Sequence, residues 1–243
     1  MLDFSSRAAD DELMDRPDSS ARLLGNTLRQ FHWINRTLTP CHRLLRRHVL
    51  RRMREDPRRA WTMLDIGAGG CDLPIWLVDR CRRERINLAI TAVDHDPRVV
   101  AFARSRLADH PEIRIVQGDA LSLADIPPGS WDFIFSNHFL HHLSTPQIET
   151  CLRQVVRACR ERCIMSDLVR SRMSYWLYTA FAGAFLRDSF AFDDGRLSIR
   201  KSLTRREATR LVEGDPRLAV LGVHAVFPGH LVLLSRPSPR ADG

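Results

Sequence analysis

The stretch that decides the fold is residues 64–74, Leu-Asp-Ile-Gly-Ala-Gly-Gly-Cys-Asp-Leu-Pro. A short apolar run at 62–66 predicts a buried β-strand, and the glycines after it predict a tight turn. Residues 73–83 then have the apolar spacing of a helix. Glycine lets the backbone turn sharply and lie against a ligand, because no Cβ stands in the way. This strand–turn–helix unit is typical of an α/β fold with a ligand at the turn.

Strands and helices continue to alternate after this unit. Apolar runs at 88–93, 113–116, 131–136 and 163–168 predict four more strands, with helices at 97–107 and 145–159. Such alternation predicts a parallel sheet covered by helices on both faces. Two last runs, 218–226 and 230–235, are separated by Pro228-Gly229 and predict a hairpin.

The segments that flank the alternating region are helical. Residues 20–54 have helical periodicity broken at Pro40, and residues 1–20 are expected to be loosely ordered. We therefore predict an N-terminal helical cap at 1–56 and a ligand-binding domain at 57–243. The aromatic-rich stretch at about 172–200 is expected to be a helical lid; the alternative is a helix that only packs on the core.

Composition narrows the class of protein. The chain has 243 residues, of which 44% are hydrophobic and 27% charged, as in ordinary globular domains. No apolar run is long enough to span a bilayer, and the polar, acidic N-terminus is unlike a secretory signal. Six cysteines without a C-x-x-C pair indicate reduced thiols, so we expect a cytoplasmic protein with no metal site and no membrane partner.

The net charge of +8 comes almost entirely from arginine, since Lys201 is the only lysine. The preference for arginine over lysine is typical of codon bias, so the positive charge by itself is weak evidence for a nucleic-acid partner. We expect a monomer or a homodimer that binds no nucleic acid.

Polar groups stand where the predicted strands end, and ligands of such sheets bind beyond those ends. Asp94 can accept hydrogen bonds from both hydroxyls of a ribose, and Asp119-Ala120 is placed for an adenine amino group. A dinucleotide fold requires G-x-G-x-x-G, but the third glycine position here is Asp72. That carboxylate disfavours a pyrophosphate and tolerates a ligand that carries an ammonium and a sulfonium group.

These residues resemble class I S-adenosylmethionine-dependent methyltransferases over roughly residues 60–170. The matching motifs are 64–74, Val93-Asp-His-Asp-Pro, Gly118-Asp-Ala-Leu, and Asp132-Phe-Ile-Phe-Ser-Asn-His-Phe-Leu-His-His-Leu. Residues 28–35, 166–172 and 194–204 are similar to small bacterial methyltransferases of natural-product pathways, which often act on phenolic or quinone-like rings.

The resemblance implies a Rossmann-like α/β fold: a seven-stranded, mostly parallel sheet whose last strand is antiparallel, with N-terminal helices and a helical insertion after the fifth strand. It also implies S-adenosyl-L-methionine as the cofactor and a small molecule, aromatic or polyketide-like, as the acceptor, with O-methylation preferred. The residues expected at the cofactor are Asp65, Gly67, Ala68, Gly69, Asp94, His95, Asp119, Ala120 and Asn137. The alternative for Asp65 is that it orients a backbone turn without touching the ligand.

Methyl transfer mainly requires that two reactants be positioned, and a base helps when the acceptor has a proton to lose. His138, His141 and His142 follow the fourth strand, where the methyl group should point, and we expect the base among them. The alternative for His141 and His142 is that they cap a helix or pack beneath the cofactor. The residues expected at the acceptor are Asp167, Arg170, Tyr175 and Tyr178; Asp167 and Arg170 are alternatively a structural ion pair.

Three other functions remain open at this point. A nucleic-acid methyltransferase agrees with the charge, but the fourth strand ends in Ser-Asn-His-Phe, not in an Asn-Pro-Pro-Tyr run. An oxidoreductase on the same fold is opposed by Asp72. A protein that binds the cofactor without catalysis is the third.

Overall fold

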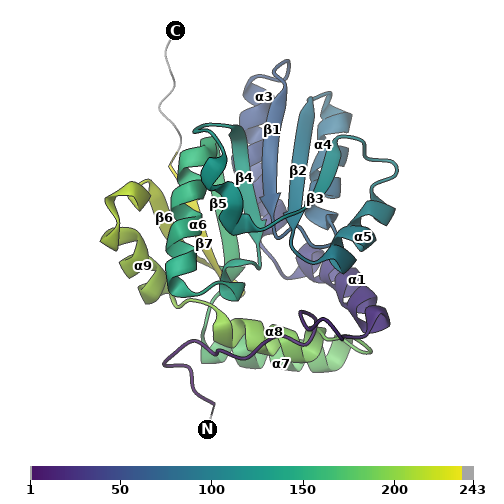
Figure 1. Ribbon diagram of the computed structural model, residues 1–243, viewed down its shortest axis with the longest axis vertical. Helices are drawn as coiled ribbons and strands as arrows, with labels where there is room; N and C mark the ends of the chain where they lie inside the picture. Colours follow the sequence, from purple (N-terminus) through teal and green to yellow (C-terminus); the bar gives the residue numbers. More distant parts are fainter. Residues whose placement is uncertain (1, 237–243) are drawn as a thin grey trace.

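The computed structural model describes residues 2–236, except for the side chains of residues 123–125. Seven strands form one sheet in the order β3-β2-β1-β4-β5-β7-β6 (Figure 1). The strands are β1 (Trp61–Ile66), β2 (Leu88–Asp94), β3 (Ile113–Gln117), β4 (Trp131–Asn137), β5 (Cys159–Leu168), β6 (Leu221–Val226) and β7 (His230–Ser235). Strands β1 to β5 pair in parallel, and β7 runs antiparallel to both β5 and β6. The predicted Rossmann-like sheet with an antiparallel last strand is confirmed.

Helices cover both faces of the sheet. One core cluster joins the sheet to α2 (Cys41–Leu44), the π-helix η1 (Leu45–Leu50), α3 (Arg51–Glu55), α4 (Asp72–Glu84) and α5 (Pro97–Arg106). A second cluster joins the other face to α6 (Thr145–Ala158) and α9 (Arg205–Gly214). Short 3-10 turns occur at η2 (Ala120–Asp125), η3 (Leu140–His142) and η4 (Pro216–Leu218).

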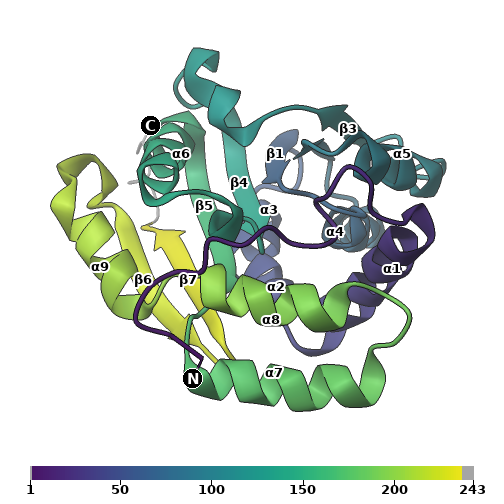
Figure 2. The same ribbon diagram turned by 60° about the horizontal axis from the view of Figure 1, so that its bottom comes forward.

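Three further helices lie across one end of the sheet (Figure 2). These are α1 (Ala21–Thr37), α7 (Arg172–Phe185) and α8 (Ala191–Lys201). Ser20 caps the start of α1, because its side chain accepts a hydrogen bond from the Leu23 backbone N–H. Pro40 lies between α1 and α2, where the sequence predicted a break.

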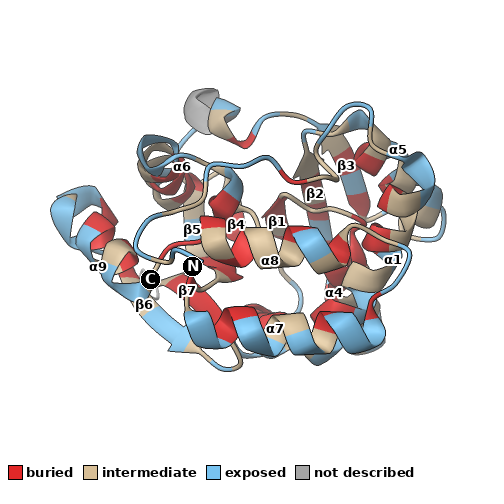
Figure 3. Cartoon of the chain, turned by 90° about the horizontal axis from the view of Figure 1, so that it is seen from below, coloured by how far each residue is buried: buried red, intermediate tan, exposed pale blue. Residues whose placement is uncertain are grey.

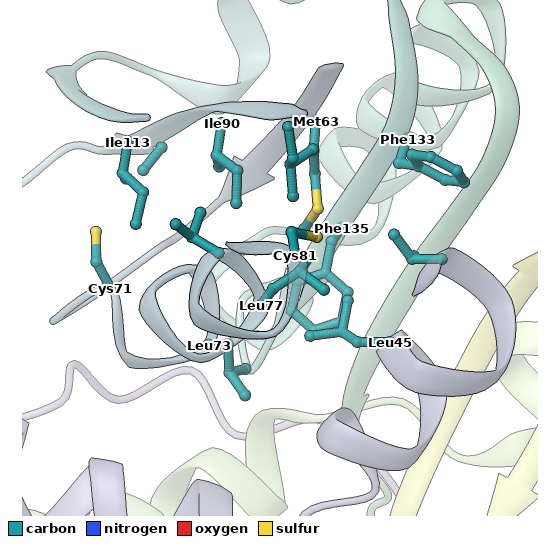
Figure 4. Close-up of a cluster of buried hydrophobic side chains, with 14 of the residues drawn as sticks. Leu45, Met63, Cys71, Leu73, Leu77, Cys81, Ile90, Ile113, Phe133 and Phe135 are labelled. Carbon is teal, nitrogen blue, oxygen red and sulfur yellow. The ribbon is translucent and has the colours of Figure 1, made fainter. Parts of the chain in front are cut away.

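Side-chain alternation along the strands explains why both faces are buried. On β4, Phe133 and Phe135 belong to the first core cluster, while Ile134 between them belongs to the second. Figure 4 shows the first cluster, in which Leu77 and Cys81 of α4 belong to the same core as Phe133 and Phe135 of β4. A sheet buried on both faces leaves only strand ends and loops for polar chemistry.

The N-terminal segment, residues 2–20, contains no helix or strand, yet it is held in place along α8 (Figure 1). The Asp194 carboxylate accepts hydrogen bonds from the backbone N–H groups of Leu13 and Met14 at 2.7 and 2.9 Å. The guanidinium of Arg7 donates to the carbonyls of His141, Leu143 and Lys201. The prediction of a loosely ordered segment was therefore wrong for these residues, because long-range contacts fix it.

Strand β5 begins at Cys159, four residues earlier than the sequence predicted, where the expected helix was to end. Among the residues that the structure describes, no helix has the length and apolarity needed to cross a membrane.

Candidate functional site

A cavity of about 420 Å³ lies beyond the carboxyl ends of β1, β2 and β4. This volume falls within the usual range of small-molecule sites. All nine residues predicted at the cofactor line it: Asp65, Gly67, Ala68, Gly69, Asp94, His95, Asp119, Ala120 and Asn137. Side chains of α1, α7, α8 and the N-terminal segment form the opposite wall. The strand ends therefore meet the predicted cap and lid regions around one space.

The glycine turn after β1 has the conformation that its sequence predicts. Gly67 and Gly69 have φ of +67° and +53°, a region that other residues rarely adopt. A Cβ on Gly67 would stand 3.0 Å from the Phe139 ring, whereas a Cβ on Gly69 would meet no atom within 4 Å. The backbone N–H of Gly69 donates to Asp94 Oδ2 at 3.0 Å. The space above Gly69 is thus open for a ligand, and the turn is tied to the end of β2.

Three carboxylates, those of Asp65, Asp72 and Asp94, give this end of the cavity a negative potential. Asp65 is 3% exposed, and its carboxylate has no hydrogen-bond or ion-pair partner among the described residues. Burial, followed by the charges of Asp72 and Asp94, raises the pKa of Asp65 well above its ordinary value. Burial also raises the pKa of Asp94, although N–H groups of Asp96 and Gly69 oppose the shift. Such a site favours a cationic ligand and disfavours a phosphate.

An amide chain connects this acidic end with α1. Asn137 donates from Nδ2 to Asn35 Oδ1 at 3.0 Å, and Asn35 donates from Nδ2 to Asp72 Oδ2 at 2.9 Å. The Oδ1 atom of Asn137 is buried without a hydrogen-bond partner on the cavity wall. A buried acceptor of this kind calls for a donor from a ligand. An ammonium group can donate to an unpaired amide oxygen and is attracted by a carboxylate such as that of Asp65, so the residues present suit a ligand such as S-adenosylmethionine.

His138 forms a pair that the sequence did not predict. Its Nε2 lies 3.0 Å from Nε2 of His230, at the start of β7, and the two rings are stacked. Burial lowers the pKa of His138 to about 3 and that of His230 to about 4, so both imidazoles are neutral at pH 7. His138 has a φ of +55°, which is uncommon for a residue with a side chain and typical of functional sites. Both residues line the cavity.

His141 also lines the cavity, but both of its ring nitrogens face carboxylates. Nδ1 lies 2.7 Å from Asp167 Oδ1, and Nε2 lies 3.5 Å from Glu12 Oε1. The backbone N–H of His141 donates to the second Asp167 oxygen at 2.8 Å. Charge from His141 and this hydrogen bonding lower the pKa of Asp167 to about 2 despite its burial. His141 is therefore clamped rather than free to approach an acceptor.

His142, the third predicted histidine, is paired with Asp15 of the N-terminal segment. Its Nδ1 lies 3.1 Å from Asp15 Oδ2, and this contact raises the pKa of His142 despite its burial. Within residues 2–236, Glu12, His141 and His142 are the group whose potential metal-ligand atoms lie within 4.8 Å of one another. The Lys201 ammonium lies 3.4 Å from Glu12 Oε1 and places a positive charge at the same spot.

The residues predicted at the acceptor divide into two groups. Tyr178 lines the cavity and donates from its hydroxyl to the Ala191 carbonyl at 2.5 Å. Asp167, Arg170 and Tyr175 lie behind the wall: Asp167 holds His141, Tyr175 bonds to Arg196, and Arg170 donates to the carbonyls of Phe4 and Ser202 and to Glu207. Arg170 and Asp167 do not pair with each other in the structure.

Some wall residues come from parts of the sequence that gave no signal for them. Asn35, Glu12, Asp15, Asp194 and His230 all line the cavity. They lie far from the glycine turn in the sequence and follow no local motif, so only the tertiary fold brings them together. Asn35 and Asp194 each had one indirect signal, because Asn35 ends the stretch 28–35 and Asp194 begins the stretch 194–204, in both of which the sequence resembles known methyltransferases.

Comparisons with known proteins give one family match and several similar folds. Residues 63–162 match the family model described as a methyltransferase domain. No curated protein matches the sequence. A methyltransferase of Aquifex aeolicus, described as SAM dependent, is similar in structure, with a TM-score of 0.58 and 14% identity over 87% of this chain and 97% of that chain.

Two further solved structures are similar. Human N-acetylserotonin methyltransferase, in complex with SAM, has a TM-score of 0.58 and 14% identity over 90% of this chain and 57% of that chain. The plantazolicin methyltransferase BamL, in complex with SAH, has a TM-score of 0.57 and 15% identity over 84% and 76%. The family match and the cavity support S-adenosylmethionine as the cofactor. Residues 63–162 are thus similar to a methyltransferase domain, and the fold of the chain is a Rossmann-like seven-stranded sheet.

Proposed function

We propose that this chain transfers the methyl group of S-adenosylmethionine to a hydroxyl oxygen of a small aromatic or polyketide-like molecule. The observation that carries the proposal is the asymmetry of the cavity. Its β1–β2 end is acidic and glycine-lined, whereas its α1–α7 end is lined by Phe31, Leu38, Tyr178 and Phe181. A cationic cofactor suits the first end, and a flat apolar acceptor suits the second.

The cofactor would be held by residues of the strand ends. Asp94 offers its free carboxylate lone pairs to ribose hydroxyls, and Asp65 with Asn137 Oδ1 would receive an ammonium group. When bound, S-adenosylmethionine supplies a methyl group already activated by the sulfonium. What remains for the protein is to orient the acceptor and to exclude water.

His138 is the best placed of the three histidines to contact the acceptor. His141 is clamped between Asp167 and Glu12, and His142 is paired with Asp15. His138 is neutral, lines the cavity, and has only His230 as a side-chain hydrogen-bond partner within the described chain. We infer that it accepts a hydrogen bond from the acceptor hydroxyl and orients the oxygen. Because its pKa is low, it takes the proton only once methyl transfer has made that oxygen strongly acidic.

We also propose that residues 172–200 act as a lid and residues 1–56 as a cap. Helix α7 contributes Leu177 and Phe181 to the wall, and α8 contributes Asp194 and Ser198. Two solved structures of similar fold are a plantazolicin methyltransferase and the CMeT domain of the citrinin polyketide synthase. Their names favour a natural-product acceptor for this chain.

Calorimetry with S-adenosylmethionine and S-adenosylhomocysteine tests the cofactor, with Asp94→Ala as the variant expected to abolish the heat. Release of S-adenosylhomocysteine in the presence of a panel of phenols then tests the acceptor class. Heat without turnover on any phenol would contradict O-methylation, and no heat from either compound would contradict the whole proposal. Transfer to bulk RNA would favour a nucleic-acid acceptor instead.

A further inference from the structure

Helix α7 is apolar on both of its sides. One side buries Tyr175 and Ala182. The other side exposes Met173, Trp176, Leu177 and Phe185, which are 51–64% accessible. A helix that is hydrophobic all round is normally buried on all sides. Figure 3 shows the exposed side of α7 at the surface, and no described part of the chain covers it.

Helix α1 extends this exposed side. Trp33 is 41% exposed, stacks on Phe181 with ring centroids 5.3 Å apart, and also contacts Phe185. We call Trp33, Met173, Trp176, Leu177 and Phe185 the apolar patch. Most of the large hydrophobic side chains exposed within residues 2–236 belong to it; the others are Leu2, Val220 and Phe227. Such clustering marks an interaction surface.

Positive charge accompanies the patch. Arg29 and Arg36 lie one turn on either side of Trp33 along α1, and Arg172 and Arg187 stand at the two ends of α7. All four are exposed, and none has a carboxylate partner among the described residues. No Asp or Glu occurs at 19–54 or at 168–187. The two helices therefore present aromatic and apolar groups beside uncompensated cations.

We propose that the apolar patch docks on an anionic lipid surface. Tryptophan, phenylalanine and leucine flanked by arginine are the groups that bind at the boundary between lipid headgroups and acyl chains. Arginines near an anionic bilayer add electrostatic attraction. A second copy of the chain is a poorer occupant, because two patches with the same positive rim repel each other.

The sequence led us to expect no membrane partner, because no segment is long enough to span a bilayer. Docking needs no such segment: α7 has 14 residues, too few to cross the hydrocarbon core, and lies flat at one end of the molecule (Figure 2). Peripheral binding and the absence of a spanning helix are therefore compatible.

Helix α7 would then separate the lipid from the cavity. Leu177 belongs both to the apolar patch and to the cavity wall, and Tyr178 and Phe181 of the same helix also line the cavity. A displacement of α7 would open a path from the lipid to the acceptor end. This step rests on the proposed methyl transfer: such a path would favour an acceptor that partitions into lipid. The docking itself does not depend on the proposed function.

Co-sedimentation with vesicles tests the docking on the full chain. We expect binding to vesicles of phosphatidylcholine with 30% phosphatidylglycerol, weaker binding to pure phosphatidylcholine, and weakening by 0.5 M salt. Trp176→Ser combined with Phe185→Ser should lower the partition coefficient at least tenfold. Arg29→Gln with Arg36→Gln should lower it by about fivefold for each arginine.

Matched controls lie on the other side of the molecule. Val220→Ser removes another exposed apolar side chain, and Arg205→Gln with Arg206→Gln removes two exposed charges from α9; neither should change the binding. Calorimetry with S-adenosylmethionine on the same samples reports cofactor binding separately, so either proposal can fail alone. Failure to bind anionic vesicles, or binding that the apolar double variant leaves intact, would overturn the docking. So would a stable dimer in light scattering that this double variant dissociates.

Discussion

The Nε2 atoms of His138 and His230 lie 3.0 Å apart on the cavity wall, and burial keeps both imidazoles neutral. One ring must donate and the other must accept, so the two rings have opposite tautomers. The Nδ1 of His230 is buried without a partner. A hydroxyl that reaches the pair thus meets preoriented hydrogen-bonding groups on the cavity wall.

The pair makes stability depend on pH. Both histidines have a pKa in the folded protein, about 3 and about 4, below the ordinary value of 6.5. The unfolded chain therefore binds more protons between pH 6.5 and pH 4, so stability is present above 6.5 and is lost as the pH falls. We expect the free energy of unfolding to drop by on the order of 6 kcal/mol between pH 7 and pH 4, with about 3 kcal/mol from each histidine.

Urea denaturation at a series of pH values measures this loss. His230→Gln should flatten the slope in that window, whereas His32→Gln, which changes an exposed histidine on α1, should leave it unchanged. An unaltered slope in His230→Gln would show that other groups control the acid response.

The same pair affects catalysis if His138 contacts the acceptor. His138→Asn should lower kcat by about 100-fold, the lower range for loss of a general base, with a small effect on KM. Cofactor affinity by calorimetry should stay within about threefold of the unchanged protein. Equal losses in kcat and in cofactor affinity would instead indicate that His138 only shapes the cavity.

The Asp65 carboxylate should lower the stability of the ligand-free protein and strengthen cofactor binding. Its carboxylate is buried beside Asp72 and Asp94, so Asp65→Asn removes a repelled charge and should stabilise the ligand-free protein by about 1 kcal/mol. The same change should weaken S-adenosylmethionine binding by about tenfold or more, since charge-assisted hydrogen bonds are the stronger ones. Thermal unfolding with and without the cofactor measures both effects in one experiment. Destabilisation of the ligand-free protein would contradict a ligand role for Asp65.

The two glycines of the turn should respond differently to alanine. Gly67→Ala brings a Cβ to 3.0 Å from Phe139 at positive φ, so it should destabilise the fold by about 2 kcal/mol. Gly69→Ala also places alanine at a positive φ, but its Cβ would meet no atom within 4 Å. It should therefore lower the free energy of unfolding by only about 1 kcal/mol. Because its new methyl group enters open cavity, Gly69→Ala should lower cofactor affinity further. Equal effects on stability would show that Phe139 moves aside.

The sequence predicted the sheet and its ligand end well, because both rest on local signals. Short apolar runs bounded by turn residues predicted the strands, and Asp65, Gly69 and Asp94 stand at strand ends that the fold must bring together. Asn35 and His230 belong to the same wall, yet α1 and β7 meet it only through tertiary packing. No spacing in the sequence records a contact between residues 102 or 92 positions apart.

The N-terminal segment is a second place where long-range contacts, which the sequence pattern does not record, decide the structure. Residues 2–20 have few apolar groups and many charges, a composition that predicts loose order. Glu12 is nonetheless 2% exposed, because Lys201, Ser198 and His141 surround its carboxylate. Each of these partners is more than 120 residues away in the sequence, so composition alone could not show that they compensate the charge.

Lys201, the only lysine of the chain, is the cation in this buried cluster, and that role can be measured. Lys201→Met should destabilise the protein by about 3 kcal/mol, because it leaves the Glu12 carboxylate buried without its ammonium partner. Adding Glu12→Gln to Lys201→Met should recover much of that loss, since no unpaired charge then remains. A double-mutant cycle by urea denaturation gives the coupling energy, and Arg205→Met on exposed α9 is the control, expected to change stability by less than about 0.5 kcal/mol. If the losses of the two single variants simply add, the ion pair does not hold the N-terminal segment, which is then held by the hydrogen bonds of Asp194 and Arg7.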